Sequence, residues 1–172
     1  MMNVEKPELI PAVPADLDEI WAMCVQVRLR TPTAGWSDEY PTRGIIAEDL
    51  ASGELYKVLD GARIISIMKI RSWADFMAGE EEPDIDGWDP AIQNPCALGR
   101  FCVDPDYQGQ GLGRRIMLAT LDKAKALGYD GAQFHAVTSN PVCNHLYESM
   151  GFHKAGHLCE YGTEFYCYDM KL

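Results

Sequence analysis

The residues with the clearest chemical meaning form a glycine-rich segment in the middle of the chain. A strand expected over residues 97–103 is followed by D-P-D-Y and then by Gln108, Gly109, Gln110, Gly111, Leu112 and Gly113, where a helix begins. Glycines let an anion approach the backbone, and the N–H groups and dipole of a helix N-terminus favour its charge. Arg114 and Arg115 come next, and two cations at that end oppose the helix dipole unless an anion lies beside them. The sequence therefore predicts a phosphate or pyrophosphate site.

Spacing separates the three phosphate motifs that this segment could represent. A dinucleotide fingerprint requires glycine at position 114, which is Arg, and a Walker loop requires Lys and then Ser or Thr after Gly113. The remaining pattern, Q-x-x-G-x-G after an apolar strand, closely resembles the acyl-coenzyme A loop of the GNAT superfamily of N-acyltransferases. Downstream, NPVCNHLYESMGF resembles the superfamily's N-x-x-A-x-x-x-Y-x-x-x-G-F segment, with Asn140 and Tyr147 matched and Cys143 in place of alanine.

The resemblance implies an N-acetyltransferase that uses acetyl-coenzyme A as co-substrate. An amine would attack the thioester directly in a ternary complex, and a backbone N–H near Phe101 or Cys102 would polarise the thioester carbonyl. Phe101 and Val103 would pair with the pantetheine arm as an added strand. Tyr147 would donate a proton to the leaving thiolate, which a neutral phenol can do at pH 7. The implied coenzyme-binding residues are Phe101, Cys102, Val103, Gln108, Gly109, Gln110, Gly111, Leu112, Gly113, Arg114 and Asn140.

These residues also have purely structural interpretations. Tyr147 could be a core aromatic on an amphipathic helix, and Asn140 could be the N-cap of a helix whose first residue is Pro141. The arginines of the first helical turn could be solvated surface residues. The alternative function is a catalytically weak module that binds or senses acyl-coenzyme A.

The general base is not identified by the sequence. Residues 97–103 contain no carboxylate, and Arg100 is their only ionisable side chain apart from Cys102. Arg100 could lie beside the acceptor or be an exposed strand residue. Glu82, Asp84, His135 or a chain of waters could deprotonate the amine, and the choice among them stays open.

The elements that must position these residues follow an α/β order. Apolar spacing predicts helices over residues 17–27, 42–51, 112–127 and 141–150. Strands are predicted over residues 55–59, 63–70, 97–103 and 132–137, with two more around Leu158 and Tyr166. The resemblance implies a mixed central sheet, mostly antiparallel with a splayed parallel pair, flanked by helices. With 172 residues and no repeat or low-complexity linker, we expect one domain over residues 1–172.

Composition excludes several classes of protein. A hydrophobic content of 47% with 24% charged residues is typical of globular proteins. A net charge of −11 disfavours nucleic acids and anionic membranes as partners. No apolar run approaches a bilayer span and no export signal is visible, so we expect a cytoplasmic protein.

The cysteines and histidines do not predict a metal site. The six cysteines include no C-x-x-C pair and lie in apolar patterns, which predicts buried, reduced thiols. The sequence brings His153, His157 and Cys159 close together, and Cys143 close to His145, but at spacings that suit no compact tetrahedral site. We therefore expect no metal.

An acidic segment bears on the acceptor. Residues 72–99 hold no Lys or Arg, and their carboxylates are Asp75, Glu80, Glu81, Glu82, Asp84, Asp86 and Asp89. An acidic loop near a cleft concentrates cations, so the expected acceptor is a small-molecule or peptide amine, with a cationic one favoured by this loop. A merely solvated loop is the equally weighted alternative. The sequence leaves the oligomeric state open between monomer and homodimer.

Overall fold

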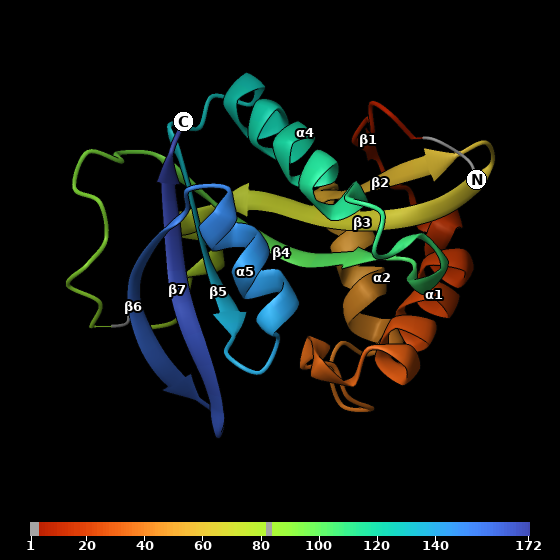
Figure 1. Cartoon of the computed structure of the whole chain (residues 1–172), viewed down its shortest axis with the longest axis horizontal. Coiled ribbons are helices and arrows are strands. Elements are labelled where there is room, and N and C mark those ends of the chain that lie inside the picture. The colour runs from red at the N-terminus through yellow and green to blue at the C-terminus, as the bar shows by residue number, and fades with distance from the viewer. Residues whose placement is uncertain (1–3, 82–83) are drawn as a thin grey trace. The chain divides into compact units, whose positions relative to one another are not determined.

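The computed structural model describes residues 4–81 and 84–172, and its strands follow the hydrogen-bonded order β1-β2-β3-β4-β5-β7-β6 (Figure 1). The pair β4–β5 is parallel, whereas β1–β2, β2–β3, β5–β7 and β6–β7 are antiparallel. The predicted fold class is confirmed: the sheet is mixed, mostly antiparallel, and has one parallel pair. Contacts group the chain into two compact units. The first holds the described residues up to Ile70 and Gly99–Thr120, and the second holds Arg71–Leu98 and Leu121–Leu172.

The observed elements match the predicted order closely. The strands are β1 (Ile10–Pro11), β2 (Leu55–Asp60), β3 (Arg63–Ser72), β4 (Pro95–Val103), β5 (Gly131–Val137), β6 (His153–Glu160) and β7 (Thr163–Lys171). The helices are α1 (Leu17–Arg30), α2 (Arg43–Ser52), α3 (Trp73–Phe76), α4 (Leu112–Ala126) and α5 (Pro141–Ser149). Among the helices described, none has both the length and the apolar character needed to cross a bilayer.

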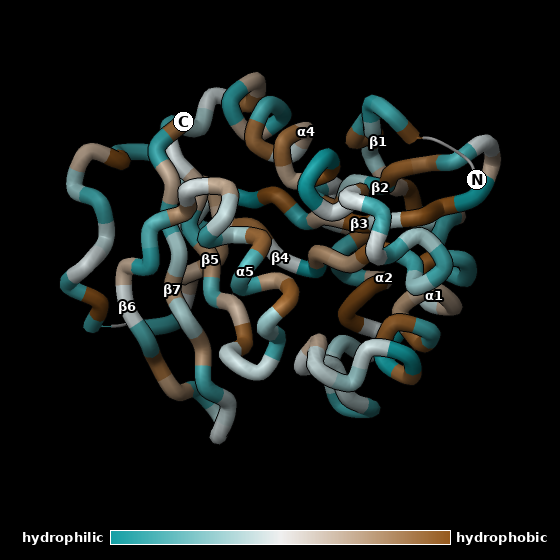
Figure 2. The backbone as a smooth tube through the Cα atoms, in the orientation of Figure 1, coloured by the Kyte–Doolittle hydropathy of each residue, from teal (hydrophilic) through white to brown (hydrophobic). Residues whose placement is uncertain are grey.

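In the first unit, α1 and α2 bury their apolar residues against β2 and β3. Ile20 of α1, Ile46 of α2 and Ile67 of β3 belong to one core cluster and are fully buried. Figure 2 shows the corresponding hydrophobic segments in α2 and β3. The Thr42 side chain caps α2 by accepting from the Ile45 N–H at 3.2 Å, which satisfies a donor that the first turn leaves free.

A buried carboxylate in the first unit holds two cations. Asp49 of α2 is 3% exposed, and one of its oxygens accepts from Arg100 Nε at 2.8 Å while the other pairs with Lys69. Arg100 also donates to the Tyr40 hydroxyl and lies over the Tyr40 ring. The sequence suggested that Arg100 lies beside an acceptor or is an exposed strand residue. Neither interpretation included what the structure shows, which is that the guanidinium pairs with the buried Asp49 and with Tyr40.

In the second unit, α5 packs against β5 and β7 through aromatic rings. The Tyr147 ring lies edge-on to Phe134 at 4.7 Å and is 5.4 Å from Tyr168, measured between ring centroids. Phe152, just beyond the helix, lies 5.2 Å from Phe134. This cluster fixes the orientation of α5 on the strands.

The segment between β3 and β4 belongs to the second unit and partly packs on β6 and β7, so it is not wholly solvated. It opens with the short helix α3, which the sequence did not predict because four residues show no helical period. A Cβ on Gly87 would lie 1.9 Å from the Ala155 carbonyl oxygen of β6, so only glycine permits this approach. The Asp89 N–H donates to the buried Asp169 carboxylate at 2.6 Å. The exposed part of the segment includes Asp84 and Asp86.

The cysteine prediction needs one correction. All six cysteines are free, and Cys24, Cys96, Cys102 and Cys167 are buried as expected. Cys143 is only half-buried, and Cys159 is exposed near the end of β6, because β6 is paired on one side only, with β7.

We expect Asp49→Asn to lower the free energy of unfolding by about 3 to 5 kcal/mol, because it leaves Lys69 and Arg100 without their buried counter-charge. Urea denaturation followed by circular dichroism measures the change. Asp38→Asn is the matched control, since Asp38 pairs with Arg28 at 3.0 Å but is 90% exposed, and its loss should change stability little. Equal effects of the two substitutions would show that the Asp49 cluster contributes no more than a surface ion pair.

Candidate functional site

The glycine-rich loop connects β4 to α4 in the first unit and has the geometry of an anion cradle. Gly109 and Gly111 adopt φ values of 75° and 71°, a left-handed conformation that favours glycine. Arg115 fixes the loop by donating from Nη1 to the Gln110 carbonyl at 3.3 Å and from Nε to the Val4 carbonyl at 3.2 Å. Arg115 is therefore a structural residue of the loop, whereas Arg114 is exposed on the same helical turn.

The segment before the loop is held by ion pairs. Asp106 accepts from Arg30 of α1 at 2.8 Å and from Arg63 of β3 at 2.9 Å, and Arg63 also contacts Asp104 at 2.7 Å. The Arg30 and Arg63 guanidinium groups lower the pKa of the Asp106 carboxyl. The Tyr107 hydroxyl donates to Asp60 at 2.8 Å. The sequence motif V-D-P-D-Y thus works as an anchor for the loop.

The loop fits a pyrophosphate group. Within the part of the chain that the structure describes, no backbone hydrogen bond uses the N–H groups of Gly109, Gly111 or Gly113. These donors stand at the N-terminus of α4, where the helix dipole adds positive potential. Gln108 has a different role: its side chain donates to the Val103 carbonyl at 2.9 Å and so ties the loop to the end of β4.

Strand β4 leaves regular geometry just before the predicted coenzyme-binding residues. Its pairing with β5 covers Pro95, Cys96 and Ala97 and ends there among the described residues. Arg100 then adopts a φ of 52°, a conformation that non-glycine residues rarely take. Among the described residues this pairing does not extend to Phe101–Val103, and a strand backbone without a partner on one side is an arrangement that an extended ligand can join.

Asn140 and Tyr147 lie on α5 in the second unit. The Asn140 side chain accepts from the Cys143 N–H at 3.2 Å, so its interpretation as an N-cap is confirmed. Tyr147 is 7% exposed, and burial raises the pKa of its phenol well above the usual value near 10. The phenol therefore keeps its proton at neutral pH. Its neighbours include the Cys143 thiol, whose own pKa is raised by burial.

The structure describes two of the side chains that could act as the general base, His135 and Asp84. Burial lowers the pKa of His135 to about 4, so this imidazole is neutral at pH 7 and a weak base. Asp84 is exposed, and Glu82 lies outside the described residues.

His135 belongs to an aromatic cluster on β5 that the sequence did not reveal. Its ring centroid lies 5.7 Å from those of both Trp73 and Phe76, 6.4 Å from Trp88 and 6.3 Å from Phe165. Its Nε2 atom is enclosed and finds no hydrogen-bond partner among the described residues. A buried polar atom in this state costs about 1 to 3 kcal/mol, which a ligand or water can remove.

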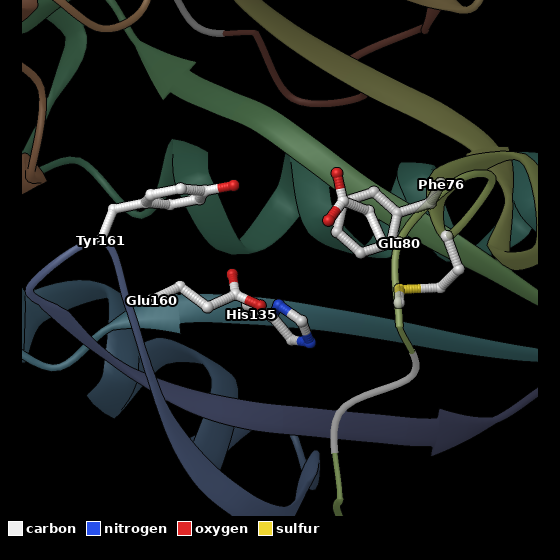
Figure 3. Close-up of a pocket in the computed structure, with 6 residues that line it drawn as sticks. Phe76, Glu80, His135, Glu160 and Tyr161 are labelled. Atoms are coloured by element: carbon white, nitrogen blue, oxygen red, sulfur yellow. The ribbon is translucent and has the colours of Figure 1, made fainter.

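A cavity of about 450 Å³ opens beside this cluster within the second unit. Figure 3 shows its walls, which are formed by Phe76, Met77, Glu80, His135, Glu160 and Tyr161. Glu160 and Tyr161 come from the tip of the β6–β7 hairpin. Sequence reasoning missed these two residues, although a bulky aromatic in the turn E-Y-G-T was an available signal, since such turns favour Asn or Gly.

The predicted site residues therefore fall into two groups. The first unit brings together the β4 residues Phe101, Cys102 and Val103 with the loop from Gln108 to Arg114. The second unit holds Asn140, Tyr147 and His135. Among the described residues, no group of three or more His, Cys, Asp or Glu side chains is placed to hold a metal ion.

Comparisons with known proteins find sequence similarity over part of the chain. A family model described as an acetyltransferase (GNAT) domain matches residues 74–154. The Escherichia coli K12 protein [ribosomal protein bS18]-alanine N-acetyltransferase is 36% identical over 64 residues, which are 37% of this chain and 43% of that protein. The chain thus matches less than half the length of this curated relative.

Solved structures agree on the fold. A GNAT-family acetyltransferase from Streptococcus agalactiae aligns over 100% of this chain and 99% of its own, with a TM-score of 0.76 and 15% identity. The PaiA N-acetyltransferase of Thermoplasma acidophilum, solved with coenzyme A, covers 97% and 99% with a TM-score of 0.70 and 14% identity. The fold is that of the GNAT acetyltransferases. The match to an acetyltransferase (GNAT) domain over residues 74–154 and this shared fold both agree with the resemblance seen in the sequence.

We expect His135 to make the protein less stable in mild acid. Because its pKa is about 4 in the folded chain and 6.5 in an unfolded one, protons bind the unfolded state preferentially between these values. The stability that His135 contributes is complete above about pH 6.5 and is lost as the pH falls to 4, by up to about 3 kcal/mol. Urea denaturation of the parent and of His135→Phe from pH 7.5 to 4.5 measures this, and parallel pH curves would contradict it.

Proposed function

We propose that this chain transfers the acetyl group of acetyl-coenzyme A to a primary amine. The observation that carries the proposal is the anchored loop at Gly109–Gly113, in which the N–H groups of Gly109, Gly111 and Gly113 make no backbone hydrogen bond within the described residues. Cradles of this kind suit a pyrophosphate. The backbone of β4 at Phe101–Val103, to which the pairing with β5 does not extend among the described residues, suits the amide groups of a pantetheine arm. The match of residues 74–154 to an acetyltransferase domain supports the same assignment.

In the proposed reaction the amine nitrogen attacks the thioester carbonyl carbon, and the carbon–sulfur bond then breaks. Because the attack is direct, no covalent enzyme intermediate is needed. The nitrogen loses one proton to a base, and the departing sulfur is stabilised by one proton donor. A backbone N–H near Phe101 or Cys102, next to the left-handed Arg100, would stabilise the developing oxyanion. The clamp of Arg100 by Asp49 supports this role, since it holds the strand in its irregular shape.

Tyr147 is the proposed proton donor to the sulfur. A thiol has a pKa of about 8.5, below that of a buried phenol, so complete proton transfer from Tyr147 is uphill. The phenol would therefore act by donating a strong hydrogen bond to the thiolate as negative charge develops there.

The proposed acceptor is a small-molecule or peptide amine. The bS18 relative is named for an alanine of a ribosomal protein, which is one example of a peptide acceptor. The alternative is a binding or sensing module for acyl-coenzyme A, and the observation in its favour is that β4 carries no carboxylate to act as base. Release of free thiol from acetyl-coenzyme A over a panel of amines separates the two: acceptor-dependent release supports the enzyme, and its absence despite coenzyme binding supports the module.

We expect acetyl-coenzyme A to raise the melting temperature of the protein. A ligand that binds only the folded state adds about 2.7 kcal/mol at a hundred times its dissociation constant. Gly111→Val should abolish the shift, because a β-branched residue cannot adopt the left-handed conformation at this position without strain. Gly44→Ala, in α2, is the control that keeps the shift, since its added Cβ meets no atom closer than 3.7 Å. If millimolar acetyl-coenzyme A leaves the melting temperature of the parent protein unchanged, the assignment of the loop as a coenzyme site is wrong.

We expect Tyr147→Phe to lower turnover by about 10² to 10³, the usual cost of losing a hydrogen-bond donor to developing negative charge, while coenzyme affinity stays nearly unchanged. The phenyl ring keeps the contacts with Phe134 and Tyr168, so the fold should be retained. Tyr166→Phe on β7 is the matched control and should leave turnover intact. Steady-state kinetics at saturating acceptor provides the measurement, and equal rates for parent and Tyr147→Phe would return Tyr147 to a packing role.

A further inference from the structure

The cavity beside His135 carries a negative potential. Its six described wall residues include the carboxylate side chains of Glu80 and Glu160 and no Lys or Arg, and burial lowers the pKa of His135 to about 4, so that this ring is neutral at pH 7. Low-dielectric walls with charge of one sign concentrate ions of the opposite sign. The cavity therefore favours a cation.

The remaining walls are apolar and aromatic. Phe76 and Tyr161 offer ring faces, and Met77 offers a flexible thioether that adapts to the shape of a ligand. Trp73 packs against both Phe76 and His135, with ring centroids 5.1 and 5.7 Å apart, and so supports this wall from behind. A small inorganic cation would leave most of these apolar surfaces uncovered, whereas an organic cation would cover them.

Tyr161 is held in a costly position at the mouth of the cavity. It has a φ of 50° at the tip of the β6–β7 hairpin, where a left-handed conformation favours Asn or Gly, and its side chain is 98% exposed. Figure 3 shows its ring extending over the cavity from the Glu160 side toward Phe76 and Glu80. Packing within the chain does not explain an aromatic residue here, but contact with a ligand does.

We propose that this cavity binds a primary ammonium group attached to an apolar, preferably aromatic, body. Glu80 and Glu160 pair with the ammonium, and Phe76 and Tyr161 contact the body. A volume of about 450 Å³ is that of a site for a small molecule or a single side chain. The identification of this ligand as the acetyl acceptor rests on the proposed function, whereas the binding itself does not.

Binding of 2-phenylethylamine to the full chain, without coenzyme, tests the proposal by isothermal titration calorimetry. 2-Phenylethanol, which has a similar shape but no charge, should bind at least about tenfold more weakly, and butylamine, which lacks the ring, should also bind more weakly. Glu80→Gln and Glu160→Gln should each weaken binding of 2-phenylethylamine by about three- to tenfold, with a smaller effect at high salt. Glu8→Gln removes the same charge from an exposed residue outside the cavity and is the matched control.

A second variant separates the ligand contact from the fold. Tyr161→Asn removes the ring but suits the left-handed backbone, so the melting temperature should stay the same or rise while affinity falls about three- to tenfold. A loss of affinity in all the cavity variants but not in Glu8→Gln supports the proposal. Equal binding of the alcohol and the amine, or unchanged affinity in the Glu80, Glu160 and Tyr161 variants, overturns it.

The two proposals fail in different ways. If 2-phenylethylamine binds with this dependence on Glu80 and Glu160 but no amine releases thiol from acetyl-coenzyme A, the cavity stands and the proposed function fails. If amines are acetylated at rates that do not change in the cavity variants, the proposed function stands and the identification of the cavity ligand as the acetyl acceptor fails.

Discussion

The carboxylate of Asp49 sits beneath the point where β4 departs from a regular strand. It joins α2 to Lys69 of β3 and to Arg100 of β4, the residue with the left-handed backbone. If either cationic partner of a buried carboxylate moves away, a buried charge is left uncompensated, which strongly destabilises the fold. The cluster thus fixes one helix and two strands at once. Because Arg100 is held by Asp49, the cluster also orients the part of β4 that begins at Phe101.

The glycine loop depends on a second set of charges outside the loop itself. Arg30 and Arg63 hold the aspartates that follow β4, and Arg115 reaches back to the Gln110 carbonyl. These three arginines therefore hold the backbone of the loop in place through contacts within the chain. A ligand that met the loop would be held mainly by backbone N–H groups, whose positions do not depend on side-chain rotamers.

The sequence predicted the features that are local along the chain. Glycines that end helices, such as Gly53 and Gly128, and the strand–loop–helix pattern around Gly111 could be located because turn and cap chemistry depends on neighbouring residues. The Asp49 cluster could not, since its partners come from three separate segments. The cavity beside His135 was missed for the same reason: its walls come from the segment after β3, from β5 and from the β6–β7 hairpin.

Gly87 makes a close contact between the segment that joins β3 to β4 and strand β6. Its backbone lies so close to the Ala155 carbonyl that no side chain fits between them. Changes of length or composition on one side of this contact are thereby insulated from the other. Relatives could vary the part that carries the exposed acids, and with it the charge near the cavity, while the part that leads into β4 keeps its course. Such a pinned segment can diversify ligand preference without disturbing the strand where chemistry is proposed to occur.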